Sequence, residues 1–344
     1  MKQKSKLKSK LLSLLLITLL TIILAGCGSQ TADKNASGKS VDQKPIPVRF
    51  GVDAGTFSLQ FHVAREKGFF AKHGIEPQIS TYSFGIDTLN AALADQVDVG
   101  EAMDFAALSR FNTGDLRIIS FIQTGKADKT KVVARDGINS PQDIKGKNFG
   151  VSKATVQEYI VSRYLDKNGY KEGEVNRVGL TSAAEIFAAF DRGDINLAFF
   201  SGTWLDKAVK VPGARIIGSQ ADIPFEARGF LVVKEKLLKE KPEAAKRILL
   251  ALDEASQWIN EHPEETGEIA FKAVKLPKEA VARDIKDITN EIRLTAEDVA
   301  QLKDVYEYAI KNKLIKGGFE LKDKIVVDPL QQTFPQKLAY DPAK

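Results

Sequence analysis

Strand-like and helix-like segments alternate along most of this chain, and no other feature of the sequence limits the possible folds so strongly. Residues 47–52 are expected to form the first strand, and residues 97–100 a short buried strand. Residues 85–94 between them are expected to form a helix, because Leu89 and Leu93 stand four residues apart. This alternation predicts βαβ units, and therefore a mostly parallel sheet covered by helices.

The same alternation repeats after residue 130. Residues 131–134 and 148–151 are expected strands, and a helix is expected from Thr155 to Asn168. Two passages, 91–99 and 188–196, each run from the end of a helix through an acidic turn into a buried strand. This similarity predicts an α/β protein with two lobes of similar build.

Beyond Val233 the pattern is helical. Pro242 and Pro263 stand at expected first positions of helices, where proline costs no hydrogen bond. Another helix is expected to open at Thr295, and the long helical end suggests that the chain returns to pack on the first lobe. Residues 331–344 are expected to form a loosely packed tail.

The amino-terminal segment predicts export from the cytoplasm. Five lysines precede a largely apolar run of 14 residues, 11–24, which is shorter than the ~20 residues that a membrane-spanning helix needs. Leu24-Ala25-Gly26-Cys27 resembles a bacterial lipobox, which implies cleavage before Cys27 and acylation of its new amino terminus. Residues 1–26 are then a lipoprotein signal peptide. An uncleaved anchor helix remains the alternative.

Residues 27–45 are polar and rich in Ser, Gly and Lys, so we expect a flexible tether. With either form of anchor, residues 46–330 work at the extracytoplasmic face of the cell membrane.

Charge and composition exclude several classes of function. Without the five leading lysines, basic and acidic residues are equal at 45 each, so no basic face for nucleic acid is expected. Cys27 is the only cysteine, and His62, His73 and His262 are scattered. We therefore expect no disulfide, no metal site and no cofactor.

Several motifs resemble a known family. They are Gly55-Thr56-Phe57-Ser58, the segment AREKGFFAKHG at 64–74, Asp98-Val99-Gly100, SPQDIKGK at 140–147, and KEKL at 234–237. Over residues 48 to about 310 the chain resembles the solute-binding proteins of ABC importers for sulfonate, taurine and nitrate, a group that includes binders of pyrimidine precursors.

The resemblance implies a type II periplasmic-binding-protein fold, in which two α/β lobes are joined by two crossing strands and hold the ligand between them. The crossings are expected near 131–135 and 229–233. Lobe I then comprises 46–132 plus 232–330, and lobe II comprises 133–231. The implied partners are a small-molecule solute and an ABC permease.

Candidate ligand residues lie at expected helix starts, where free N–H groups and the positive end of the helix dipole favour an anion. The first set is Thr56, Phe57 and Ser58, the second is Thr155 and Gln157, and the third is Asp104. Each Ser, Thr or Asp among them can equally be an ordinary helix cap, and Phe57 can equally belong to the core.

Four further candidates complete the expected site. Ser201 and Trp204 follow a buried strand of the second lobe, where Trp204 can either line the pocket or pack on a helix, and Phe84 lies at the rim. Arg228 offers a planar fork suited to carboxylate, sulfonate or phosphate, although it can instead pair with Glu226 or Asp222.

These residues predict a binding protein without catalytic residues. The expected solute is a small organic anion, because Arg228 and the amides near Thr56 and Thr155 favour negative charge. A pyrimidine or other heterocyclic precursor remains an alternative, as does a ligand-sensing lipoprotein. A pyrimidine-synthesis enzyme shares the implied fold, but its Cys-rich segment has no counterpart here.

Overall fold

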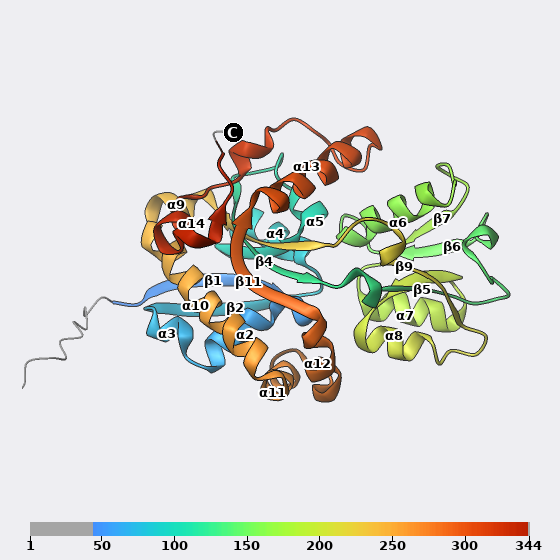
Figure 1. The fold of residues 1–344 in the computed structure, drawn as a ribbon, viewed down its shortest axis with the longest axis horizontal. Coiled ribbons are helices and arrows are strands. Elements are labelled where there is room, and N and C mark those ends of the chain that lie inside the picture. Colours follow the sequence, from blue (N-terminus) through green and yellow to red (C-terminus); the bar gives the residue numbers. More distant parts are fainter. Residues whose placement is uncertain (1–43, 343–344) are drawn as a thin grey trace, which may run out of the picture. The chain divides into compact units, whose positions relative to one another are not determined.

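A computed structural model describes residues 44–342 of this chain (Figure 1). The predicted signal peptide 1–26, Cys27 and the tether up to residue 43 lie outside the described residues. Within 44–342, no helix is both long enough and apolar enough to cross a membrane.

The described chain contains two β-sheets, and we call the part built around each sheet a lobe. The sheet of lobe I has seven strands in the order β12-β11-β4-β10-β3-β1-β2. These are β1 (Ile46–Asp53), β2 (Ile75–Tyr82), β3 (Val99–Met103), β4 (Leu116–Gly125), β10 (Arg228–Lys234), β11 (Ile288–Thr295) and β12 (Leu338–Ala339). Strand β1 is parallel to β2 and β3, whereas β10 is antiparallel to β3 and β4.

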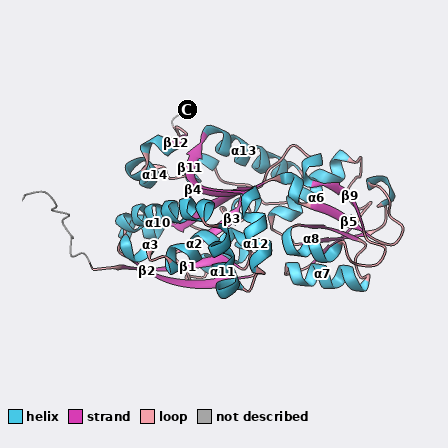
Figure 2. Ribbon diagram, turned by 60° about the horizontal axis from the view of Figure 1, so that its bottom comes forward, coloured by secondary structure: helices cyan, strands magenta, loops and turns pink. Residues whose placement is uncertain are grey.

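The helices of lobe I pack around its sheet in two groups (Figures 1 and 2). One group comprises α2 (Leu59–Glu66), α3 (Phe69–Lys72), α10 (Pro242–Glu261), α11 (Pro263–Val274) and α14 (Asp328–Thr333). The other comprises α4 (Gly85–Leu93), α5 (Asp104–Leu108) and α13 (Ala296–Lys311). Helices α9 (Glu235–Glu240) and α12 (Lys278–Asp284) follow β10 and α11.

Lobe II has a five-stranded sheet in the order β7-β6-β8-β5-β9. Its strands are β5 (Lys131–Ala134), β6 (Asn148–Val151), β7 (Asn176–Gly179), β8 (Leu197–Phe200) and β9 (Arg215–Ser219). Its helices are α6 (Val156–Lys167), α7 (Ala183–Arg192) and α8 (Gly202–Ala208). Lobe II therefore repeats the α/β design of lobe I on a smaller scale.

Two chain segments connect the lobes. Residues 126–130 lead from β4 into β5, and residues 220–227 return from β9 to β10. The expected lobe boundaries, after 132 and after 231, fall inside β5 and β10, so the connections lie a few residues earlier than expected.

The main hydrophobic core runs from one lobe into the other. Tyr159 on α6 is buried, and its ring centroid lies 6.2 Å from that of Phe105 on α5. Phe225, in the second connection, lies 4.7 Å from Tyr159, and Tyr308 on α13 lies 5.2 Å from it. These aromatic contacts fasten α6 of lobe II to lobe I on one side.

The expectation of helices alone after Val233 is wrong. Strand β11 pairs antiparallel with β4 inside the sheet of lobe I. Its residues Asn290, Ile292 and Leu294 are buried while their neighbours are less so, which is the period of two that marks a strand.

Two smaller expectations also differ from the structure. The helix expected from Leu59 to Phe70 is broken at Gly68, whose φ of 76° is left-handed. The tail expected from 331 is not loose, because Leu338 and Ala339 pair in parallel with β11. Leu330, just before it, is fully buried.

Candidate functional site

A cavity of about 570 Å³ lies between the two lobes. Thr56 follows the carboxyl end of β1, Met103 ends β3, Gln157 follows β6, and Ser201 follows β8; all four line the cavity. Because ligands of open α/β sheets bind beyond the carboxyl ends of the strands, this cleft is the candidate binding site. Its volume is within the range of small-molecule sites.

The lining combines three kinds of side chain. Apolar contacts come from Met103, Val156, Ile160, Leu205, Ala227 and Ile288; neutral polar groups from Thr56, Gln123, Thr130, Gln157, Ser201 and Gln220; charges from Lys126, Lys129, Asp206, Arg283, Asp284 and Asp287. Such a lining suits a solute that has both a polar and an apolar part.

Arg283 joins the lobes across the cleft. Its guanidinium lies 2.6 Å from Asp284 on the same lobe and 3.0 Å from Asp206 on α8 of lobe II. The hydrogen bonds that Arg283 donates to these two carboxylates, the bond to Asp284 first, raise the pKa of Arg283 further above its ordinary value. The pair with Asp206 therefore favours the approach of α8 to α12.

The two cleft lysines share one carboxylate. Lys126 and Lys129 lie 2.8 Å and 2.9 Å from Asp287. Their hydrogen bonds hold the pKa of Asp287 below its ordinary value. Every cation of the lining is thus paired with a carboxylate of the lining.

Three of the ten predicted ligand residues line the cavity, namely Thr56, Gln157 and Ser201. Thr155 stands next to the cavity as the cap of α6. Its hydroxyl oxygen accepts a hydrogen bond from the Gln157 amide at 3.2 Å, and its hydroxyl donates to the Ser152 carbonyl at 2.8 Å.

Phe57, Ser58 and Phe84 also lie outside the cavity lining. Phe57 is buried against Gly229, where an added Cβ would lie 2.1 Å from its ring. The buried Ser58 hydroxyl donates to the Gly55 carbonyl at 2.9 Å. Phe84 packs against the main core, and its amide donates to Asp87 at 3.1 Å.

Asp104 and Arg228 bind protein groups rather than facing the cavity. Arg228 lies 2.6 Å from Glu297 and 3.2 Å from Asp298. The Asp104 carboxylate accepts hydrogen bonds from the amides of Phe105 and Arg228. Burial raises the pKa of Asp104 to about 7, although these amides favour its charged form.

Trp204 does not line the cavity either. Its ring centroid lies 5.7 Å from that of Phe187, and the Lys207 ammonium lies 4.4 Å from the ring. It therefore packs between α7 and α8.

Sequence reasoning missed Gln123, Gln220 and all six charged residues of the lining. Gln123 lies near the carboxyl end of β4, after the apolar run Ile118–Ile122, so a polar residue ending a buried strand was an available signal. Arg283 and Asp206 stand on helices with no distinctive pattern. Gln220 lies in a connection, where no periodicity exists.

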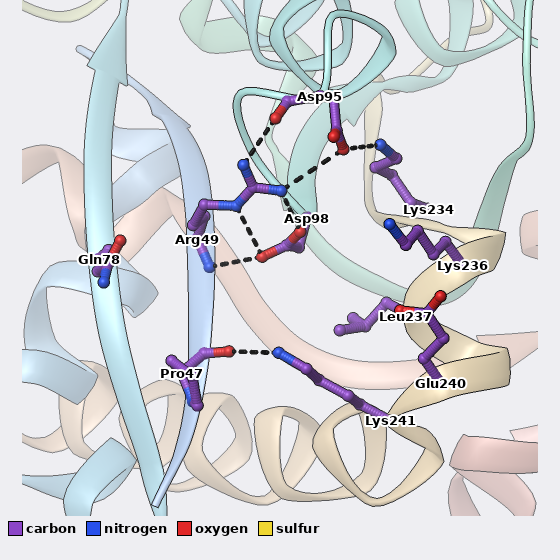
Figure 3. A pocket seen from close by; sticks show the side chains of 10 residues that line it. All are labelled: Pro47, Arg49, Gln78, Asp95, Asp98, Lys234, Lys236, Leu237, Glu240 and Lys241. Carbon is purple, nitrogen blue, oxygen red and sulfur yellow. Dashed lines mark hydrogen bonds and ion pairs between the residues drawn. The ribbon is translucent and has the colours of Figure 1, made fainter.

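A second cavity, of about 300 Å³, lies on lobe I near the start of β1 (Figure 3). Arg49 there lies 2.6 Å from Asp98 and 3.5 Å from Asp95, and Asp95 also pairs with Lys234. Lys241 donates to the Pro47 carbonyl at 3.1 Å. Since Thr56 follows the other end of β1, this charged cavity is separate from the cleft.

No three His, Cys, Asp or Glu side chains between 44 and 342 are grouped so that they could hold a metal ion.

Comparison with solved structures defines the class of fold. The alkanesulfonate-binding protein SsuA of Xanthomonas axonopodis, solved with MOPS, superposes with a TM-score of 0.71 at 16% identity, over 83% of this chain and 99% of that one. The chain thus has the type II periplasmic-binding-protein fold, as its sequence predicts. The desulfurization enzyme DSZB also has this fold, with a TM-score of 0.62 at 14% identity, over 84% of this chain and 99% of that one.

The protein belongs to the NMT1/THI5-like family, whose model matches residues 57–266. A Brucella abortus protein provisionally named a binding protein is 28% identical over 263 residues, which are 73% of this chain and 80% of that one. A Bacillus subtilis protein provisionally named an aliphatic-sulfonates-binding protein is 24% identical over 311 residues, 88% of this chain and 91% of that one. The family resemblance predicted from the motifs is confirmed.

Proposed function

We propose that this protein is an extracytoplasmic solute-binding lipoprotein of an ABC importer. It captures a small organic anion, of the sulfonate or taurine type, between its two lobes and delivers it to the permease. The observation that carries this proposal is the cleft of about 570 Å³ lined by both lobes. The names of the Bacillus subtilis relative and of SsuA support the choice of solute.

The cleft offers the groups that such a solute needs. Arg283, Lys126 and Lys129 can turn toward an acidic head group, since each is at least half exposed. The amino terminus of the 12-residue helix α6 contributes its positive dipole end beside Gln157. Val156, Ile160 and Leu205 cover an aliphatic part.

Binding works through closure of the lobes. A solute that contacts both lobes stabilises the closed arrangement over the open one by its differential affinity. The permease then distinguishes the closed shape. In this proposal acylated Cys27 holds the protein on the outer face of the cell membrane, and palmitate labelling that is lost in Cys27→Ser tests that part.

The pairing of charges favours a second candidate, a neutral heterocycle of the pyrimidine type. Because each cation of the lining already has a carboxylate partner, an anion must compete with Asp206, Asp284 or Asp287 for it. A neutral ring leaves these pairs intact and binds to the glutamines and hydroxyls.

A thermal-shift screen with alkanesulfonates, taurine, nitrate, carboxylates and pyrimidines tests the proposal. A true ligand at a hundredfold excess over its Kd stabilises the folded protein by ~2.7 kcal/mol. A shift with pyrimidines alone would replace the anion by the heterocycle, and the absence of any shift would contradict solute binding.

Incubation of the purified protein with the same candidate solutes tests for catalysis, because the enzyme DSZB shares this fold. We expect the ligand to be recovered unchanged after prolonged incubation with the protein. Product formation would make the protein an enzyme.

A further inference from the structure

Two glutamines of the cleft are nearly buried and are held by backbone carbonyl groups. Gln123 on β4 is 3% exposed, and Gln220, in the connection from β9 to β10, is 5% exposed. Both line the cavity between the lobes.

The side-chain amide of Gln123 has a fixed orientation. Its Nε2 donates to the Thr56 carbonyl at 3.3 Å and to Asn290 Oδ1 at 2.9 Å. A backbone carbonyl can only accept a hydrogen bond, so the NH₂ group must face Thr56. Both of its hydrogens are then used, and Oε1 is left as an acceptor.

Gln220 is held in the same manner. Its Nε2 donates to the Phe225 carbonyl at 3.2 Å, and its backbone amide donates to the Thr130 carbonyl at 2.9 Å. Its Oε1 is therefore the free end of the side chain as well.

Neither oxygen accepts a hydrogen bond from any residue in the described part of the chain. Both oxygens keep some exposure, since neither is among the fully buried side-chain atoms of residues 44–342 that lack a hydrogen-bond partner. The three carboxylates of the lining are all paired with Arg283, Lys126 or Lys129. The two amide oxygens are thus acceptors available to a solute.

We propose that Gln123 and Gln220 are specificity-determining residues that accept hydrogen bonds from a solute carrying an amino or ammonium group. This inference rests on the proposed function, because it concerns the same cleft. A solute without such a donor buries these oxygens unpaired and so loses affinity. The expected discrimination is about tenfold for one hydrogen bond.

Matched probe pairs test this inference in isothermal titration calorimetry. Taurine and ethanesulfonate differ only in the amine, and 4-aminopyrimidine and pyrimidine differ in the same way. We expect the wild-type protein to bind the amino member of its preferred pair about tenfold more tightly.

Methionine variants assign the preference to the two side chains. Gln123→Met and Gln220→Met keep the side-chain length but lose the acceptor, so each is expected to reduce the preference to about threefold or less. Gln301→Met is the matched control, because Gln301 donates to the Glu226 carbonyl at 2.8 Å outside the cavity lining. If Gln123→Met does not fold, the preference measured for Gln220→Met alone tests the inference.

The outcomes separate the two proposals. Equal affinities within a pair that binds, or a preference that survives in both methionine variants, overturn the inference and leave the proposed function standing. If no probe of either pair binds, both the inference and the proposed class of solute fall.

Discussion

The carboxyl groups of Asp53, at the end of β1, and Glu101, on β3, are neighbours in lobe I. Glu101 on β3 is fully buried, and one of its oxygens accepts a hydrogen bond from the Asp53 amide at 2.7 Å. Burial, and then the neighbouring Asp53 carboxyl, raise the pKa of Glu101 well above its ordinary value. Burial likewise raises the pKa of Asp53 to about 6, although the Gly55 and Ser58 amides favour its charged form.

We expect Glu101→Gln to stabilise the protein at neutral and alkaline pH. In the fold Glu101 keeps a proton that the unfolded chain releases above about pH 4.3, so wild-type stability falls as pH rises from there through the folded pKa. Glutamine has no proton to release. The gain in unfolding free energy should exceed about 1 kcal/mol at about pH 8 and be small at about pH 4.5, measured by urea unfolding.

Glu307→Gln is the control for this prediction, because Glu307 is exposed and its ion pair with Lys303, at 3.8 Å, is also exposed. Its effect should stay below about 0.5 kcal/mol at both pH values. An equal offset from Glu101→Gln at both pH values would contradict the assignment of a raised pKa.

Ion pairing limits what the sequence reveals about single residues. Arg228 and Asp104 have the chemistry of ligand residues, but Glu297, Asp298 and Gln301 on α13 engage them in the folded chain. These partners lie about 70 to 200 residues further along the sequence. No local pattern could have indicated which charges neutralise each other.

At the scale of elements, the start of α6 can be tested directly. Thr155→Ala removes the acceptor for the Gln157 amide and should cost about 1 kcal/mol of unfolding free energy. Thr155→Ser keeps the hydroxyl and should lose much less. Urea unfolding of the two variants measures the difference, and equal losses would show that the methyl group matters and not the cap.

Elements with an apolar run or a helix cap in their sequence were predictable, whereas a strand of mixed polar and apolar residues was not. Strand β5 and helix α6 begin where the sequence places them, because Val132 and Val133 form an apolar run and the Thr155 hydroxyl caps α6 through the Gln157 amide. Strand β11 was missed because Asn290 and Arg293 interrupt its apolar residues. Asn290 is buried beside Gln123 on β4, whose side-chain amide donates to it, and this is a tertiary contact.

For the whole molecule, the lobes contact each other on two sides with different strength. On one side, the rings of Phe105, Tyr159 and Tyr308 pack together, and Phe105 and Tyr159 are buried. The Arg283–Asp206 pair, which joins α12 to α8, is about half exposed at both partners. The second contact is therefore the one that opens and closes at low cost.

Asp206→Asn should open the ligand-free protein without unfolding it. An exposed pair contributes less than about 1 kcal/mol, so unfolding free energy should change little. The population of closed molecules should fall, and small-angle X-ray scattering should report a larger radius of gyration.

Asp194→Asn is the matched control, because Asp194 pairs at 2.7 Å with Arg192 inside lobe II. Its scattering should equal that of the wild type. Unchanged scattering in Asp206→Asn would mean that the aromatic cluster alone determines how far the lobes open.

In the sequence, lobe II is inserted between β4 and β10, two paired strands of lobe I, and this insertion favours one order of folding. Strands β4 and β10 lie side by side but are separated by about a hundred residues of sequence. Closing so long a loop is entropically unfavourable unless the loop itself is already compact. We therefore expect lobe II, which is continuous in sequence, to form before the sheet of lobe I is complete.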